Sequence, residues 1–159
     1  MILGGIRKMT LLDYPGKVAC TVFVTGCNMR CPFCHNAPLV LSPGEGEAIG
    51  AEALFSFLRK RAGILDGVCV TGGEPTLRGW LPELLRGIKS LGYAAKLDTN
   101  GTNPEMLREL IADGLVDYVA MDIKNSPQKY AETVGVPGFD ISPVIESASM
   151  LLGSGGGID

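Results

Sequence analysis

Residues 18–34 read Val-Ala-Cys-Thr-Val-Phe-Val-Thr-Gly-Cys-Asn-Met-Arg-Cys-Pro-Phe-Cys, so an apolar, β-branched run passes through one glycine into three closely spaced cysteines. The run from Val18 to Thr25 has the composition of a buried strand, which the glycine ends. Cys27, Cys31 and Cys34 then lie on one short loop. This stretch predicts a strand whose carboxyl end carries a metal-binding loop.

The cysteine loop is one ligand short of a closed metal site. Structural zinc sites take four protein ligands, as do ordinary iron–sulfur clusters. No fourth cysteine follows at a comparable spacing, so we expect a metal centre that keeps one position open for another molecule. The alternative is a structural zinc site completed by His35, although the adjacent Cys34 and His35 do not easily face one tetrahedral ion.

Two further cysteines, Cys20 and Cys69, lie within apolar runs and are expected to be small buried hydrophobic side chains. A disulfide framework is disfavoured, because the chain has five cysteines and does not open with a basic and then apolar signal segment. Reduced, clustered thiols instead favour a cytoplasmic location.

The composition predicts one globular domain. A chain of 159 residues suffices for a single core, and a hydrophobic content of 46% with 19% charged residues argues against disorder. The formal net charge of −3 gives no electrostatic reason to expect a nucleic-acid or anionic-membrane partner. No apolar run approaches the roughly 20 residues that span a bilayer.

After a predicted loop over Pro38–Gly50, the rest of the chain alternates between strand and helix patterns. The pattern predicts strands over residues 67–71, 94–98 and 116–121, and helices over 51–62, 80–91, 104–113, 127–134 and 143–152. Such alternation indicates βα units on a parallel sheet. The strands are expected to be apolar on both faces, as in a sheet covered by helices.

Chemically distinctive residues follow each predicted strand. The cysteine loop follows the first, and the later groups are Gly72-Gly73-Glu74, Asp98-Thr99-Asn100-Gly101 and Asp122-Ile123-Lys124. Because the carboxyl ends of parallel strands lie at one edge, these groups are expected to form a single active site.

The expected fold is α/β, a partial (βα) barrel of parallel strands with outer helices, in one domain over residues 1–159. Residues 153–157 are predicted to turn and Ile158-Asp159 to begin a fifth strand, with a glycine-rich linker as the alternative for this tail. Four strands do not close a barrel, so we expect further C-terminal βα units to be missing.

The Cys-x3-Cys-x2-Cys loop, placed before a Gly-Gly-Glu strand end, resembles that of the radical S-adenosylmethionine (SAM) superfamily. The resemblance implies that Cys27, Cys31 and Cys34 bind a [4Fe-4S] cluster and that SAM chelates the fourth iron. Reductive cleavage of SAM would then give a 5′-deoxyadenosyl radical that abstracts hydrogen from the substrate.

Further motifs resemble those of the glycyl-radical-enzyme activating enzymes. They are residues 31–36, Leu97 to Gly101, Met121 to Lys124 and the opening stretch 8–16. Their nearest likeness is to the subgroup that acts on anaerobic ribonucleoside-triphosphate reductase. The resemblance implies a glycyl radical enzyme as protein substrate and a flavodoxin- or ferredoxin-type reductant.

The resemblance also assigns roles around the cofactor. Phe33 would pack on the adenine, and His35 would lie near the cofactor or order the loop. Gly72, Gly73 and Glu74 would receive the amino group of SAM, because glycine allows close approach and a carboxylate accepts from an ammonium. The alternatives are loop packing for Phe33 and a plain turn for the Gly-Gly-Glu group.

The two aspartate motifs complete the expected site. Asp98 and Asp122 would help bind a monovalent cation beside the SAM carboxylate, since oxygen ligands suit such an ion. Lys124 would pair with that carboxylate, and Ile123 would take part as a member of the same motif. The alternatives are helix capping for Asp98 and a solvated side chain for Lys124.

Two other functions remain open from the sequence. One is a radical SAM enzyme that abstracts hydrogen from a small molecule or a peptide. The other belongs to a different class, a zinc-binding or electron-transfer module without catalysis.

Overall fold

The computed structural model describes residues 1–41 and 48–153. The strands are β1 (Ile2–Leu3), β2 (Gly5–Thr10), β3 (Ala19–Val24), β4 (Ile49–Gly50), β5 (Gly67–Gly72), β6 (Ala94–Thr99) and β7 (Tyr118–Met121). The α-helices are α1 (Ala37–Leu41), α2 (Ala51–Arg59), α3 (Leu81–Ser90), α4 (Pro104–Ala112), α5 (Tyr130–Thr133) and α6 (Ser142–Gly153), with short 3-10 helices at Pro75–Leu77 and Pro127–Lys129. No helix in these ranges is long and apolar enough to cross a membrane.

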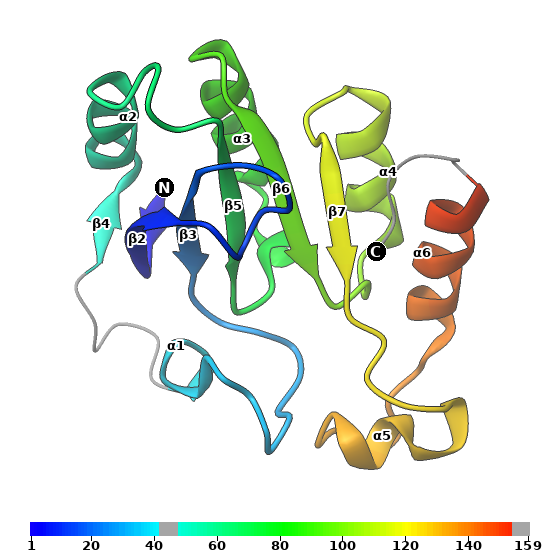
Figure 1. The fold of residues 1–159 in the computed structure, drawn as a ribbon. Coiled ribbons are helices and arrows are strands. Elements are labelled where there is room, and N and C mark those ends of the chain that lie inside the picture. Colours follow the sequence, from blue (N-terminus) through cyan, green and yellow to red (C-terminus); the bar gives the residue numbers. More distant parts are fainter. Residues whose placement is uncertain (42–47, 154–159) are drawn as a thin grey trace.

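The main sheet has the order β2-β3-β5-β6-β7. Strands β3, β5, β6 and β7 are parallel neighbours, whereas β2 pairs antiparallel with β3. The four parallel strands therefore end at one edge, where the cysteine loop, α1 and α5 lie (Figure 1). Strands β1 and β4 form a separate antiparallel pair. The predicted α/β architecture with a parallel sheet is confirmed.

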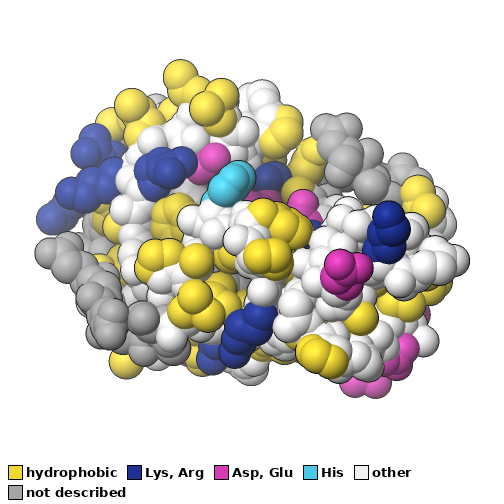
Figure 2. All heavy atoms as spheres, turned by 90° about the horizontal axis from the view of Figure 1, so that it is seen from below, with side chains coloured by type: hydrophobic (Ala, Val, Ile, Leu, Met, Phe, Trp, Pro, Cys, Tyr) yellow, Lys and Arg dark blue, Asp and Glu magenta, His cyan; other side chains and the backbone are white. Residues whose placement is uncertain are grey.

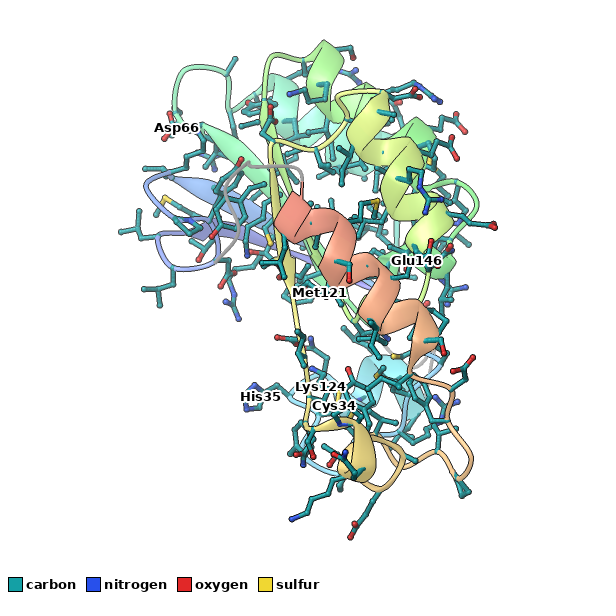
Figure 3. The ribbon with its side chains drawn as sticks, turned by 90° about the vertical axis from the view of Figure 1, so that its right-hand side faces the viewer. Cys34, His35, Asp66, Met121, Lys124 and Glu146 are labelled. Carbon is teal, nitrogen blue, oxygen red and sulfur yellow. The ribbon has the colours of Figure 1, made fainter. Side chains whose placement is uncertain are left out.

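The main core lies between the sheet and helices α2, α3 and α4, which cover one face (Figures 1 and 3). Every second strand residue points into it, as Val22, Val70 and Leu97 show, and none of these three is exposed. They pack with fully buried helix residues such as Leu58 and Leu85. Three βα connections with helices on the same face give the curvature of a partial barrel.

The opposite face of the sheet is polar, and among the described elements no helix covers it. It carries Cys69 and Lys96, with the Lys96 ammonium over the Tyr118 ring at 5.8 Å. The connection from β2 to β3 crosses this face (Figure 1), with the Tyr14 ring 6.0 Å from the Tyr118 ring. The expectation of strands that are apolar on both faces is therefore wrong, because β6 carries the paired charges of Lys96 and Asp98 on this face.

Local sequence signals explain the turn before β3 and the start of α4. The Lys17 N–H donates to the Tyr14 oxygen at 3.2 Å, and Gly16 has the positive φ of +70° that this turn requires. The Asn103 side chain accepts from the Met106 N–H at 3.2 Å and so caps α4. The elements predicted from the pattern are found, with boundaries shifted by at most three residues.

The predicted loop over Pro38–Gly50 is wrong at both ends, where α1 and β4 lie. Strands β1 and β2 were not predicted, because β2 is a largely exposed edge strand without regular apolar alternation. Of the predicted turn over residues 153–157, Gly153 ends α6 and the rest lies outside the described residues, as does the predicted strand at Ile158-Asp159.

A second, smaller core supports the carboxyl edge of the sheet. Met29 from the cysteine loop packs with Tyr130 and Val134 from the α5 region and with Val144 of α6. The Arg30 N–H also donates to the Val134 oxygen at 2.8 Å. The segment after β7 therefore holds the cysteine loop in place.

Candidate active site

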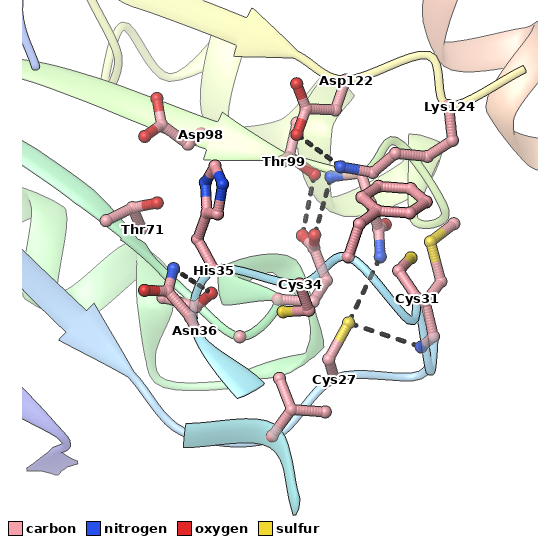
Figure 4. Close-up of a pocket in the computed structure, with 17 residues that line it drawn as sticks. Cys27, Cys31, Cys34, His35, Asn36, Thr71, Asp98, Thr99, Asp122 and Lys124 are labelled. Atoms are coloured by element: carbon pink, nitrogen blue, oxygen red, sulfur yellow. Dashed lines mark hydrogen bonds and ion pairs between the residues drawn. The ribbon is translucent and has the colours of Figure 1, made fainter. Parts of the chain in front are cut away.

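The cysteine loop leaves the end of β3 and leads into α1. Cys27, Cys31 and Cys34 are free, partly exposed thiols that line one pocket (Figure 4). The Arg30 guanidinium orders the loop by donating from Nη1 to the Cys27 oxygen, at 2.6 Å, and to the Met29 oxygen, at 2.8 Å. The three predicted ligands therefore share one pocket on a loop that its own contacts hold.

The three thiols can be compared with what a single ion and a cluster require. Within residues 1–41 and 48–153, no three Cys, His, Asp or Glu side chains are close enough together to hold one metal ion. Zinc needs its ligands around one atom, whereas each thiolate of a [4Fe-4S] cluster binds a different iron. Three cysteine sulfurs in one pocket are the donor type and number that a [4Fe-4S] cluster with three protein ligands takes.

Burial raises the pKa of both Cys27 and Cys31 above the usual thiol value. For Cys31 the nearby ammonium of Lys124 acts in the opposite direction without cancelling the effect of burial. Because thiolates are the metal-binding form, cluster assembly must displace these protons.

The Gly-Gly-Glu turn packs directly against the start of the cysteine loop. A Cβ at Gly72 would lie 2.4 Å from the Val24 oxygen, and one at Gly73 would lie 1.9 Å from the Gly26 oxygen. The N–H groups of Gly73 and Glu74 donate to these two oxygens, each at 2.8 Å. The two glycines are therefore required for contact between β5 and the loop, in addition to any contact with a ligand.

Glu74 is almost fully buried, with 1% of its surface exposed. Its Oε1 accepts from the Thr76 N–H at 3.1 Å and from the hydroxyls of Thr76, at 2.6 Å, and Thr99, at 2.7 Å. Its Oε2 accepts from the Asn100 N–H at 2.7 Å. Burial raises the pKa of Glu74, while these hydrogen bonds act in the opposite direction. The carboxyl group thus joins the ends of β5 and β6, and its contact with a cofactor amino group stays a prediction.

Each carboxylate predicted to bind a cation is paired with a lysine. Lys96 Nζ lies 2.6 Å from Asp98, and Lys124 Nζ lies 2.6 Å from Asp122. Burial alone would lower the pKa of Lys124, but Asp122 outweighs it, so this pKa lies above its usual value. Asp98 lies within β6 and caps no helix, since Asn103 caps α4. The helix-cap alternative for Asp98 is therefore wrong, and Lys124 is a partly exposed lysine paired with Asp122.

The remaining predicted site residues differ in their positions. Phe33 and His35 are exposed and line the pocket, with His35 pointing from the loop toward the strand that carries Asp98 (Figure 4). Figure 2 shows His35 at the surface of this end of the molecule, beside apolar side chains. The Ile123 side chain is 65% exposed and does not line the pocket.

The pocket has a volume of about 450 Å³, within the usual range for small-molecule sites. It receives residues from the ends of all four parallel strands, as expected. Its lining also includes residues to which the sequence suggested no role: Met29, Asn36, Val40, Thr71, Thr99 and Asn100. Thr99 and Asn100 belong to the motif from Asp98 to Gly101, so their position directly after a strand was the signal that could have identified them. The apolar residues Met29 and Val40 carried no such signal.

The Radical SAM superfamily model matches residues 21–157, which include most of β3, the cysteine loop and the whole of β5, β6 and β7. The chain belongs to the radical SAM superfamily. Membership implies a [4Fe-4S] cluster and SAM as cofactors. The geometry of the cysteine loop and the size of the pocket both fit these groups.

Two curated relatives share more specific similarity with this radical SAM chain. A putative glycyl-radical enzyme activating enzyme of Methanocaldococcus jannaschii is 40% identical over 137 residues, covering 84% of this chain and 54% of the relative. The pyruvate formate-lyase-activating enzyme of Clostridium pasteurianum is 32% identical over 133 residues, covering 79% and 54%. The chain thus spans about half the length of these relatives.

The radical SAM fold is also found among solved structures. The crystal structure of Streptococcus suis SuiB aligns with a TM-score of 0.63 at 21% identity, covering 87% of this chain and 31% of SuiB. At this identity the likeness concerns the fold alone.

Proposed function

We propose that this radical SAM chain is the cofactor-binding part of an activase that installs a glycyl radical on a partner enzyme. The observation that carries the proposal is the 40% identity to a relative described as a putative glycyl-radical enzyme activating enzyme. The pocket supports it, because three thiols and the ends of four parallel strands meet there.

Cys27, Cys31 and Cys34 are assigned as the cluster ligands. When bound, the cluster supplies one electron for the reductive cleavage of SAM. The protein contributes by presenting the three thiols from one ordered loop, with Arg30 and the Gly72-Gly73 turn fixing its start.

The remaining pocket residues are assigned to SAM. The Lys124 ammonium is available to the SAM carboxylate if it exchanges Asp122 for the ligand. The exposed Phe33 ring offers a surface for the adenine, and His35 lines the same pocket. The backbone of the Gly72–Glu74 turn is assigned to the amino group. We assign no role to the Ile123 side chain, since it does not line the pocket.

A monovalent cation beside Asp98 and Asp122 is also part of the proposal. In the structure both carboxylates hold a lysine ammonium, so the cation must replace Lys96 or Lys124 when SAM binds. Potassium-dependent SAM affinity, measured by isothermal titration with potassium or with a bulky organic cation as the salt, tests this point. Equal affinity in both salts would reject it.

Anaerobic ribonucleoside-triphosphate reductase is proposed as the partner, with a flavodoxin- or ferredoxin-type protein as reductant. The five free cysteines suit a reducing compartment, for which we propose the cytoplasm.

The test is direct activation. The protein, reconstituted with iron and sulfide without oxygen, is incubated with SAM, dithionite and the reductase, and the glycyl radical is measured by electron paramagnetic resonance. Cys31→Ala serves as the inactive control. A reductase radical that depends on SAM and on Cys31 supports the proposal. SAM cleavage without a radical on the reductase or on pyruvate formate-lyase would reject it in favour of a small-molecule or peptide substrate.

A further inference from the structure

Asn100 follows β6 and lies almost fully buried at the pocket wall, with 6% of its surface exposed. Its side-chain Oδ1 accepts from the Thr102 N–H at 3.0 Å and from the Thr102 hydroxyl at 2.7 Å. A backbone N–H only donates, so the amide of Asn100 cannot be reversed without losing this bond. Its NH2 group is therefore fixed toward the cysteine loop.

The Asn100 NH2 group meets two acceptors on that loop. Nδ2 lies 2.9 Å from the Asn28 side-chain oxygen and 3.7 Å from the Cys27 sulfur. Asn28 in turn donates from its own Nδ2 to the Thr102 hydroxyl at 2.9 Å. Each donor and acceptor in this ring of three side chains has a consistent partner, which makes the orientation well determined.

Cys27 differs from the other two cysteines in its hydrogen bonds. Its sulfur receives the Met29 N–H at 3.4 Å as well as the Asn100 amide. Among the residues that the structure describes, no side-chain N–H group donates to the sulfur of Cys31 or Cys34, and the backbone hydrogen bond at Cys31 comes from its own N–H. The charge on one of the three thiolates is therefore stabilised from outside the loop.

The donor is held rigidly from the sheet side. The Asn100 N–H donates to the buried Glu74 carboxyl group, which also accepts from Thr99. A chain of contacts thus runs from the end of β5 through Glu74 and Asn100 to Cys27. These contacts hold the amide near the sulfur from the sheet side, in addition to its bond with Asn28 of the cysteine loop.

We propose that Asn100 is a positioning residue for the cluster, and that its amide raises the reduction potential by donating to the Cys27 sulfur. A reduced cluster carries one more negative charge, shared with its sulfur ligands, so an N–H donor stabilises the reduced form more than the oxidised form. The inference rests on the cluster alone and holds whatever the substrate is.

The test is a redox titration of the reconstituted protein, without SAM, followed by the paramagnetic signal of the reduced cluster. Asn100→Leu removes the donor at nearly constant volume, and its midpoint potential is expected to be more negative than that of the unaltered protein at unchanged iron content. Asn100→Asp can keep the two bonds from Thr102 but donates nothing to sulfur, and it is expected to shift the potential further in the same direction.

Asn36→Ala is the matched control. Asn36 lines the same pocket, but its amide donates to the Gly72 oxygen at 3.1 Å and to no sulfur. The reduction potential of the cluster in the Asn36→Ala protein is expected to equal that of the unaltered protein. An unshifted potential in Asn100→Leu or Asn100→Asp, or an equal shift in Asn36→Ala, would overturn the proposal.

Discussion

The two faces of the sheet are formed by alternate residues of the same strands, yet they meet different constraints. On the outer face, which α2, α3 and α4 cover, Val70 and Leu97 are fully buried against helices. On the inner face, which the connection from β2 to β3 crosses, Lys96 Nζ lies 2.6 Å from Asp98 and 4.0 Å from the Cys69 sulfur. Many apolar residues of suitable volume can fill the outer face, whereas the inner face depends on specific charge and hydrogen-bond partners.

The difference continues at the carboxyl edge, where the strands deliver their residues to the pocket. Here the backbone itself is specified, since Gly73 contacts Gly26 too closely for any Cβ. Stability is therefore concentrated in the helix-covered core, and chemistry in the inner face and its edge. Substitutions in the two regions should therefore change stability and cofactor chemistry separately.

The largest effect is expected when a cysteine of the pocket is replaced, in comparison with a cysteine of the core. Cys31→Ala should abolish cluster assembly and SAM cleavage, because one of three iron ligands is lost. Cys20→Ala, in the outer-face core, should keep both. Iron content and 5′-deoxyadenosine formation are the measurements. Full iron loading and SAM cleavage in Cys31→Ala would break the comparison.

The next effect measures the outer face itself. Leu97→Ala removes a side chain with no exposed surface and should lower the free energy of unfolding by about 2–5 kcal/mol. The matched control is Leu12→Ala, since Leu12 is 91% exposed and should change stability by less than about 0.5 kcal/mol. Urea unfolding followed by circular dichroism gives both values. Equal midpoints for the two variants would contradict the assigned core.

A smaller effect is expected from the polar network at the carboxyl edge. Glu74→Gln places an NH2 group against at least one donor, so the free energy of unfolding should fall by about 1–3 kcal/mol. Glu52→Gln is the control, because the Glu52 side chain is 80% exposed in its ion pair with Arg59. The same urea experiment compares them. A Glu74→Gln protein as stable as Glu52→Gln would show that the network adds nothing.

The smallest effect on stability is expected at the edge of the sheet where the parallel strands begin. Asp117 accepts from the Ala95 N–H at 2.7 Å and from Lys89 Nζ at 2.6 Å. Burial alone would raise the pKa of Asp117, but these partners prevail and lower it. Asp117→Asn should therefore cost about 0.2–1 kcal/mol at neutral pH, for a partly exposed pair.

The pH dependence of that cost has a defined sign. A carboxyl group with a lowered folded-state pKa stabilises the protein above its unfolded pKa of about 3.9, and this contribution is lost as pH falls through the folded value. Unfolding midpoints of the two proteins should thus differ at neutral pH and converge in strong acid. A difference that grows on acidification would have the wrong sign.

The outer face and the position of the pocket could be predicted from the sequence. Helical spacing of Leu81, Leu84 and Ile88 marked the buried side of α3, and residues after parallel strands necessarily meet at one edge. Both signals are local in the chain or follow from strand direction alone.

The inner face and the hydrogen bonds of the site could not be predicted. Strand β2 has no regular apolar alternation because it is an exposed edge. The contacts of Gly73 with Gly26 and of Asn100 with Cys27 join segments that no local pattern relates. Such contacts depend on strand order and register in the folded sheet, which cannot be derived from the local pattern of a single sequence.

The central claim, that three thiols leave one iron of a cluster open to SAM, is tested most directly by electron paramagnetic resonance. The anaerobically reconstituted and reduced protein is measured with and without SAM. The account predicts a [4Fe-4S]⁺ signal whose g-values change when SAM is added. A signal that SAM leaves unchanged, or bound zinc in place of iron, would contradict it.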